Sequence, residues 1–476
     1  MGATNHPRLL AVALAALCLL AGCNGLVGPT ATPDGAGPTP TPTAGTTPTP
    51  TAAATPTPSP SPDRLGWEGG YRYDDPVSVT AADGLNASER EAVVARTMAR
   101  VERIRGLEFT DPVPVEVISR AEFRGREVRF VERRDPRVAA QFWEALFLVG
   151  EDRNATAAVG EVFGGGVVGY YTSSGGGRIV LVSDDDSPRV DTGTLAHELV
   201  HALQDQHFDR ASGFDSFDAR VGAQGLTEGD PVTVERTYRT RCAGEWSCLP
   251  GPGGSGSGGE AIARNPGVYL AFVQPYVTGP GFVADLRARS DGNWTAVNEA
   301  YADPPVASEQ VIHPEAYPDE RPANVTVPDR SGTNWTRVGR ETAGEAGVHV
   351  MFWANGFVKR GDARITTDYR HRLSTGWDGD ALVAYEGVAG AAATADGTSS
   401  GYVWRTVWDN ESEAREFQRA YETMLKLRHG AVAAGDGVYV TEDEPFVDAF
   451  RVTRTDETVT VVNAPTVEAL PEVHAR

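Results

Sequence analysis

The sequence predicts an α+β protein, mostly helical with a small sheet, that continues into a C-terminal α+β region. Three observations predict this class. Apolar residues recur at helical spacing in several long segments, and two short runs rich in valine and isoleucine flank a Ser-Gly turn. The C-terminal region combines an amphipathic helix with two strand-like runs. No internal repeat of fixed period is present.

The N-terminal end is typical of an exported lipoprotein. Arg8 precedes an apolar run over residues 9–20, which is too short for the roughly 20 residues of a membrane-spanning helix. The following residues 20–23 resemble a lipobox, so residues 1–22 are predicted to be a signal peptide and Cys23 to carry lipid. The alternative is ordinary cleavage and secretion, with no role for the Cys23 thiol.

A stalk is predicted over residues 23–62, because residues 29–62 are almost entirely Thr, Pro, Ala, Ser and Gly. Such a composition cannot bury a core and stays extended. The stalk would hold the globular part away from the membrane to which the lipid on Cys23 attaches it. Six glycosylation sequons agree with an exported surface protein, at Asn86, Asn154, Asn293, Asn324, Asn334 and Asn410.

The net charge and the cysteine content indicate the cellular compartment and exclude some classes of binding partner. The net charge is −22 and lysine occurs only at Lys359 and Lys426, which is typical of an acidic, lysine-poor halophilic surface. This charge argues against nucleic acid or anionic lipid as a partner. Outside the cell, Cys242 and Cys248 are expected to form a disulfide. A metal site at these cysteines would need two further soft ligands, which the sequence lacks.

The folded part divides into a domain over residues 63–330 and a C-terminal α+β region over residues 331–476 that packs on it or continues it. In order, the expected elements of the first domain are a helix over 87–104, a strand over 113–118, a helix over 137–149, hairpin strands over 167–171 and 178–182, a helix from Asp191 or Thr192 to Phe208, and a helix over 217–238 kinked at Pro231. A flexible loop is expected over 251–259 and a loop-rich, aromatic stretch over 269–328. The C-terminal region has a helix around 417–425 and strands over 449–452 and 458–462.

The helix beginning near residue 191 carries the sequence His197-Glu198-Leu199-Val200-His201. Because His197 and His201 are four residues apart, both imidazoles lie on one face of the helix, one turn apart. This spacing is the one with which a helix supplies two zinc ligands, and Glu198 between them is placed as general base and acid for a zinc-bound water. The sequence therefore predicts a Zn²⁺ site for hydrolysis.

The third zinc ligand must come from another segment. No histidine downstream of His201 completes the metzincin motif, so a glutamate from a later helix is expected, as in gluzincins. Glu228 is the preferred ligand, and Glu235, seven residues later and on a similar helix face, is the reserve. Asp205 lies one turn after His201. Its carboxylate either orients a metal-binding imidazole through a hydrogen bond or is exposed to solvent.

Several segments together resemble a group of zincin-like surface proteins: residues 168–171, 178–181, 196–206, 228–230 and 304–314. The whole chain is similar to a family of haloarchaeal surface lipoproteins known only by a locus tag, including residues 376–380 and 404–409. The resemblance implies a zincin-like fold and a place on the extracellular face of the cell membrane. Pro231 departs from it, because related sequences more often carry alanine there.

Two further sets of residues have alternative interpretations. His313 is a candidate for stabilising an oxyanion, as is Tyr317, but His313 precedes a proline and is equally a turn residue. Three tryptophans of the C-terminal region are interpreted as core residues rather than as a binding platform: Trp377, Trp404 and Trp408.

The function predicted from these features is that of a surface-anchored zinc metallopeptidase-like hydrolase acting on a peptide or protein. An alternative is a non-catalytic structural or binding lipoprotein that retains the zincin fold, with or without metal. The intact Glu198 favours the enzyme, because a binding protein has no need of the base. A solute-binding lipoprotein would need two lobes of alternating strands and helices, a pattern that is absent from the sequence.

Overall fold

A computed structural model describes residues 64–79, 83–125, 135–163, 167–173, 176–185, 187–211, 213–250, 264–359, 368–388, 399–442 and 445–476. The signal peptide, Cys23, the stalk and the loop expected over 251–259 lie outside these residues. Within them the chain is α+β, with twelve α-helices and three sheets. Across these residues, no helix combines the length and apolarity needed to span a bilayer.

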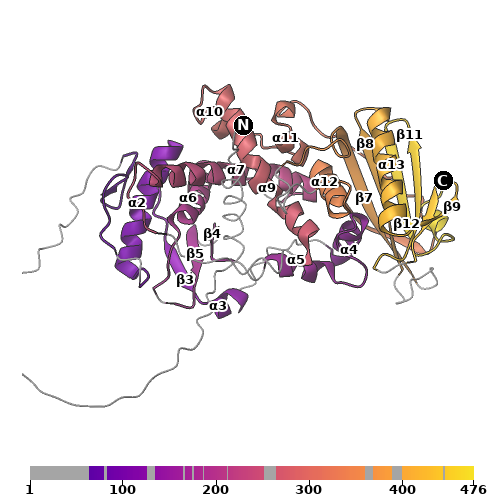
Figure 1. Cartoon of the computed structure of the whole chain (residues 1–476), viewed down its shortest axis with the longest axis horizontal. Helices are drawn as coiled ribbons and strands as arrows, with labels where there is room; N and C mark the ends of the chain where they lie inside the picture. The colour runs from indigo at the N-terminus through magenta and orange to yellow at the C-terminus, as the bar shows by residue number, and fades with distance from the viewer. Residues whose placement is uncertain are drawn as a thin grey trace, which may run out of the picture.

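The N-terminal end of the described chain forms a small α+β unit (Figure 1). Helix α2 begins after Asn86, whose side chain caps the backbone of Glu89 while the Glu89 carboxylate accepts the Asn86 N–H. A three-stranded sheet in the order β3-β5-β4 lies beside it, with β3 parallel and β4 antiparallel to the central β5. The predicted hairpin is therefore present, and β4 is an edge strand. The bounds are β1 Trp67–Glu68, β2 Tyr71–Arg72, α2 Ala87–Arg105, β3 Val115–Ile118, α3 Arg120–Gly125, β4 Gly169–Thr172 and β5 Arg178–Val182.

Helices form the middle of the molecule. Their bounds are α4 Pro136–Ala145, α5 Ala155–Phe163, α6 Thr192–His207, α7 Phe217–Cys242, α9 Pro266–Arg289, α10 Thr295–Ala300, α11 Ser308–Ile312 and α12 Gly344–Ala354, with a short 3₁₀ turn η1 at Pro314–Ala316. The prediction of a loop-rich stretch over 269–328 was wrong, because α9 is a 24-residue helix that runs through Pro275 and Pro280. A helix tolerates such prolines when tertiary packing holds it, and α9 packs extensively against α7.

Glycines allow α7 and α9 to cross with their backbones in contact. A Cβ at Gly229 of α7 would lie 2.5 Å from the backbone of Gly279 on α9, and a Cβ at Gly279 would lie 2.3 Å from the carbonyl oxygen of Gly225. Only glycine, which has no Cβ, fits between the two helices at this point. The crossing therefore fixes the part of α7 that directly follows Glu228.

The C-terminal region is built on a seven-stranded antiparallel sheet in the order β6-β7-β8-β12-β11-β10-β9. Helix α13 packs against β8, β11 and β12 and lies on one face of the sheet (Figure 1). The three tryptophans expected in the core are buried there, and Asp380 accepts hydrogen bonds from the indoles of Trp377 and Trp404. The bounds are β6 Trp335–Glu341, β7 Trp377–Gly387, β8 Ser400–Trp408, α13 Glu411–Arg428, β9 Val432–Gly435, β10 Val438–Val440, β11 Ala449–Thr455, β12 Thr458–Ala464 and α14 Leu470–Val473.

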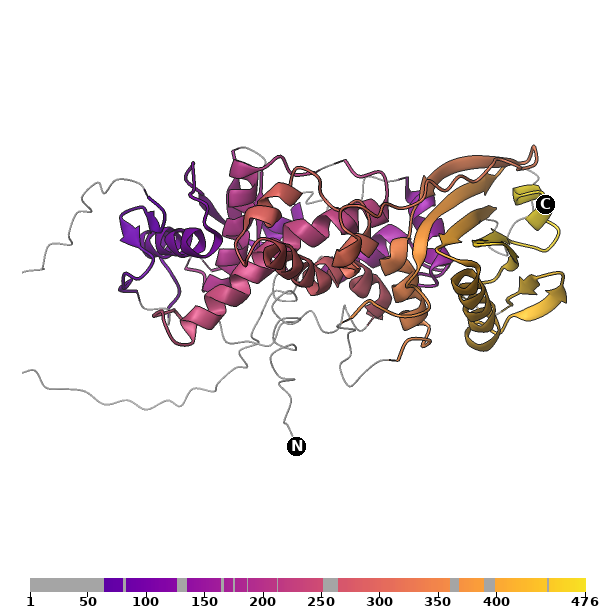
Figure 2. The ribbon, with the colours of Figure 1, turned by 90° about the horizontal axis from the view of Figure 1, so that it is seen from above.

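A single hydrophobic core joins this sheet to the middle helices. It contains buried side chains of α4, α5, α9 and α12 together with those of β7, β8 and α13. A second core, around α2, α6 and the C-terminal half of α7, lies at the other end of the elongated molecule (Figure 2). Helices α7 and α9 bridge the two ends, so the chain is continuous rather than divided into loosely tethered parts.

Candidate metal centre

Helix α6 forms where the sequence predicts it. Asp191 caps its first turn by accepting the Thr194 N–H at 2.8 Å, and its apolar face enters the N-terminal core. His197 and His201 lie one turn apart on the face directed at α7, with ring centroids 5.1 Å apart. His197 is only 1% exposed, so its ring must find polar partners inside the protein.

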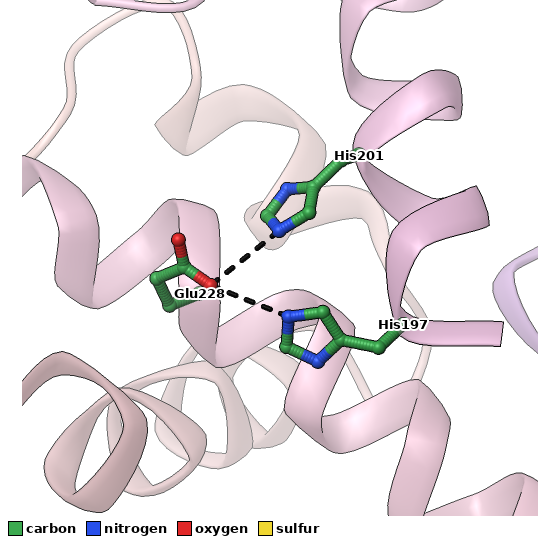
Figure 3. Close-up of side chains that lie close together, drawn as sticks. All are labelled: His197, His201 and Glu228. Carbon is green, nitrogen blue, oxygen red and sulfur yellow. Dashed lines mark ion pairs between the residues drawn. The ribbon is translucent and has the colours of Figure 1, made fainter. Parts of the chain in front are cut away.

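Glu228 on α7 lies opposite both imidazoles (Figure 3). Its Oε2 atom is 3.4 Å from His197 Nε2 and 3.4 Å from His201 Nε2. Zinc bonds of about 2.05 Å in a tetrahedron place neighbouring ligand atoms about 3.3 Å apart, so these separations suit a shared ion. The Glu228 Oε2 atom is buried and accepts no hydrogen bond of normal geometry from the residues that the structure describes. The donor set of two imidazoles and one carboxylate therefore fits zinc.

The other nitrogen of the His197 ring faces a second carboxylate. His197 Nδ1 is 3.4 Å from Glu235 Oε2, while Glu235 Oε1 accepts the Nε–H of Arg239 at 2.9 Å. Arg239 also pairs with Asp191 at the start of α6. A carboxylate behind Nδ1 favours the tautomer with hydrogen at that atom and leaves the Nε2 lone pair free for a ligand role. Glu228 and Glu235 thus face opposite nitrogens of one ring.

Gln204 contacts the Nδ1 atom of His201, as Glu235 contacts that of His197. Its Oε1 is 2.9 Å from His201 Nδ1, and its Nε2 donates to the Thr227 carbonyl at 3.0 Å. Because that carbonyl can only accept, the Gln204 amide is oriented with its oxygen toward the imidazole. The hydrogen of His201 is thereby placed on Nδ1, and Nε2 is free to face Glu228.

Pro231 explains why the Thr227 carbonyl is available. In an α-helix this carbonyl would accept the N–H of residue 231, which proline lacks. Helix α7 nevertheless continues through Pro231 to Cys242. Pro231 therefore frees the acceptor that holds Gln204, and Glu228 still faces the histidines.

Glu198 is held by the edge strand of the small sheet. Its Oε2 accepts the backbone N–H of Tyr171 on β4 at 2.8 Å. Burial raises the pKa of Glu198 above its ordinary value, although the nearby imidazoles and this hydrogen bond partly oppose the rise. The carboxylate that the motif assigns to acid–base chemistry is thus held by the edge strand and is protonated more readily than a solvated glutamate.

The carboxylates of the cluster stabilise positive charge, whether it is a proton on an imidazole or a bound cation. Burial alone would lower the pKa of His197, but the carboxylates of Glu228 and Glu235 outweigh burial and raise that pKa to about 10. Burial would raise the pKa of Glu228, but His201 and His197 hold it well below its usual range. Three acidic side chains around two imidazoles make this buried region suitable for a cation.

Other predicted site residues lie elsewhere. Asp205 pairs with Arg210 and with the hydroxyl of Tyr171, so it neither orients an imidazole nor stands free in solvent. The ring nitrogens of His313 face Glu345 at 3.2 Å and Glu315 at 3.5 Å rather than the histidine cluster. The Tyr317 hydroxyl donates to the Asp303 carbonyl. None of these contacts involves the three clustered side chains.

Tyr276 on α9 is a site residue that the sequence interpretation missed. Its ring stacks on His197, with centroids 6.2 Å apart and planes 13° apart. Burial and the charge of Glu228 raise its pKa well above the ordinary value, so the hydroxyl stays protonated as a donor. Because residues 269–328 were expected to be loop-rich, the sequence interpretation did not place Tyr276 on a helix beside His197.

A buried ion pair anchors α7 two residues beyond Glu228. Arg105 at the end of α2 donates to Asp230 at 2.9 Å, and both side chains are almost fully buried. Tyr301 donates to the other Asp230 oxygen at 2.9 Å. Hydrogen bonds therefore connect α2, through Asp230 on α7, to Tyr301.

Comparison with known proteins finds one family model. It is described as Domain of unknown function (DUF8575) and matches residues 332–474. The match contains all seven strands of the large sheet but neither α6 nor α7. No curated protein and no solved structure matches the chain. The histidine cluster lies outside the matched residues, so its interpretation depends on its own geometry.

Proposed function

We propose that this chain is a zinc-dependent hydrolase of the metallopeptidase type, with a zincin-like core formed around α6 and α7. His197, His201 and Glu228 would hold the metal. The observation that carries the proposal is the convergence of both Nε2 atoms on one buried Glu228 oxygen, at 3.4 Å each. Glu235 and Gln204 support it, because they face the opposite ring nitrogens and leave both Nε2 atoms free.

Zinc bound there would lower the pKa of a water and polarise a substrate carbonyl. The chain's own residues supply the proton transfers. Glu198 accepts the proton of the attacking water and returns it to the leaving amine, while the Tyr171 N–H keeps the carboxylate in place. Tyr276 stacks its ring on His197 and so keeps that imidazole in place beside Glu228.

A peptide or protein is the proposed substrate. Strand β4 pairs on one side only with β5 in the order β3-β5-β4, and its Tyr171 N–H contacts Glu198. An extended peptide beside such an edge would bring its backbone close to the acid–base group. The predicted lipid on Cys23 would place this activity on the extracellular face of the membrane, as in the haloarchaeal lipoproteins that the sequence resembles.

Metal content tests the proposal first. The full chain, purified without added chelator, is expected to contain one zinc per molecule by mass spectrometry, and His201→Ala and Glu228→Ala are expected to lose it. His207→Ala is the matched control, because His207 is on the same helix but contacts the Glu108 carbonyl. A folded wild-type protein without bound zinc, after incubation with the ion, would instead favour the non-catalytic surface protein.

Catalysis is tested separately with Glu198→Gln. This variant keeps the size of the side chain and an acceptor for the Tyr171 N–H, but it cannot take up a proton. We expect it to bind zinc as the wild type does and to lose peptide hydrolysis by at least about 100-fold, the usual contribution of a general base. Hydrolysis at the wild-type rate would refute the assigned role of Glu198.

A further inference from the structure

A second cluster of ligand-type side chains lies where the helical part meets the large sheet. Glu144 is near the end of α4, Glu151 lies in the connection from α4 to α5, and Asp448 directly precedes β11. One carboxylate oxygen from each lies within 4.8 Å of the others. Glu144 and Asp448 are 6% and 2% exposed. Three carboxylates from distant parts of the sequence therefore converge in a largely buried place.

Gln141 adds a fourth oxygen to this cluster. It is on α4 one turn before Glu144, is 4% exposed, and donates from its Nε2 to Glu144 Oε2 at 2.9 Å. Its Oε1 is buried and has no hydrogen-bond partner among the residues described. Both amide atoms are bonded to one carbon, so this unpartnered oxygen lies within a few ångströms of the Glu144 carboxylate. A buried amide oxygen without a donor is costly, and a cation would satisfy it.

The surroundings of the cluster are neutral or acidic. Asn463 on β12 donates its amide to Asp448 Oδ2 at 2.9 Å. The buried hydroxyls of Tyr402 and Tyr421 lie close enough to Glu144 and Asp448 to be affected by their charge. Among the described residues, neither Glu144 nor Asp448 forms an ion pair with an arginine or lysine at 4.0 Å or less. The described residues therefore supply no compensating positive charge to Glu144 and Asp448.

We propose that Glu144, Glu151 and Asp448 bind a Ca²⁺ ion, with the Gln141 oxygen as a further ligand. The donor set consists entirely of oxygen, which suits hard cations and not the softer metals that prefer nitrogen or sulfur. Calcium takes six to eight oxygens at about 2.4 Å, and bidentate carboxylates can supply many of them. Magnesium is ordinarily held by one or two carboxylates and keeps its waters. Three carboxylates and an amide therefore favour calcium.

The ion would connect two parts of the fold. The Glu151 N–H already donates to the Pro445 carbonyl at 3.1 Å, so the connection from α4 to α5 lies against the segment before β11. A cation shared by Glu144, Glu151 and Asp448 would neutralise their mutual repulsion and bind the helical part to the sheet. Because only the folded chain brings these residues together, calcium should raise the thermal stability of the protein.

The test is a calcium titration of the full chain, after chelation and at constant ionic strength, by calorimetry and by thermal unfolding. Glu151→Gln is the main variant, because Glu151 is the least buried of the three and its replacement is the least disruptive. Glu161→Gln is the matched control, since Glu161 is a nearby exposed acid on α5 that pairs with Arg153. His201→Ala in parallel excludes binding at the histidine cluster.

The wild type, the control and His201→Ala are expected to bind one calcium with the same affinity and to gain thermal stability. Glu151→Gln is expected to lose at least about tenfold in affinity, in line with the dependence of calcium sites on ligand charge. Equal affinity of Glu151→Gln and wild type would overturn the proposal, as would tighter binding of magnesium. A folded wild type that binds no calcium up to about 10 mM, above the range of weak extracellular sites, would mean that Glu144 and Asp448 share a proton instead.

Discussion

The hydrogen bonds of Gln204 offer a sharp test of how the zinc site is held. Gln204→Leu removes the acceptor that faces His201 Nδ1 and the donor that satisfies the Thr227 carbonyl. Loss of a side chain that hydrogen-bonds to a metal-binding histidine ordinarily weakens metal binding about 10- to 100-fold. This corresponds to about 1.4 to 2.7 kcal/mol of binding free energy. Leaving the buried carbonyl unsatisfied costs a further 1 to 3 kcal/mol, roughly, in the free energy of unfolding. Pro231 cannot replace the lost donor.

The two costs can be separated by two further variants. Gln204→Glu keeps an acceptor for His201 Nδ1 but loses the donor to Thr227, so zinc affinity is expected to stay within a few fold of wild type. Pro231→Ala restores an N–H to the Thr227 carbonyl. Combined with Gln204→Leu, it is expected to recover about 1 kcal/mol of stability without restoring zinc affinity.

Zinc affinity is measured by competition with a chromophoric chelator, and stability by urea unfolding of the chelated protein. Gln206→Leu is the matched control. Gln206 is on the same helix, but it accepts the Thr110 N–H and donates to the Asp111 carbonyl, both at 2.9 Å. Gln204→Leu with wild-type zinc affinity would refute the orienting role. An equal loss of affinity in Gln206→Leu would show that the effect is not specific to the site.

Three further results are expected from the structure. Asp230→Asn leaves Arg105 buried without its charged partner, so urea unfolding should show a loss of about 3 to 5 kcal/mol. Gly229→Ala places a Cβ 2.5 Å from the α9 backbone and should lower Tm, whereas Gly281→Ala, with nothing within 4 Å, should not. Burial raises the pKa of Asp218 to about 7, above the roughly 3.9 of an unfolded chain, so the folded state holds an extra proton between these values. Stability should therefore fall as pH rises from about 4 to 7, by at most about 1.4 kcal/mol per unit from this group, and Asp218→Asn should reduce that slope.

The sequence predicts those parts of the site that are encoded locally. Helix α6 follows from its cap and apolar spacing, and the common face of His197 and His201 follows from helical geometry alone. The hairpin β4–β5 is signalled by two β-branched runs around a turn. In each case, the interactions that define the element lie within a short segment of the chain.

The choice between Glu228 and Glu235 could not be made from spacing. Seven residues span about two helical turns, or about 10 Å, so both carboxylates lie on a similar face of α7. The structure shows the His197 ring between them, with Nε2 toward one and Nδ1 toward the other. Only the packing of α6 against α7 determines which carboxylate meets both histidines. Tyr276 was missed for a related reason, because residues 269–328 were expected to be loop-rich, whereas packing against α7 stabilises a helix there.

The Arg105–Asp230 ion pair contributes more to the orientation of α7 than to the free energy of unfolding. A buried ion pair of this kind often contributes no more than well-packed apolar side chains would, because desolvation offsets the attraction. An apolar pair, however, would not define the rotation of α7 about its axis. The hydrogen bonds that Arg105 and Tyr301 donate to Asp230 do define it, because each requires a particular direction. Since Glu228 is two residues before Asp230, the hydrogen bonds that fix Asp230 also turn the proposed third ligand toward the histidines.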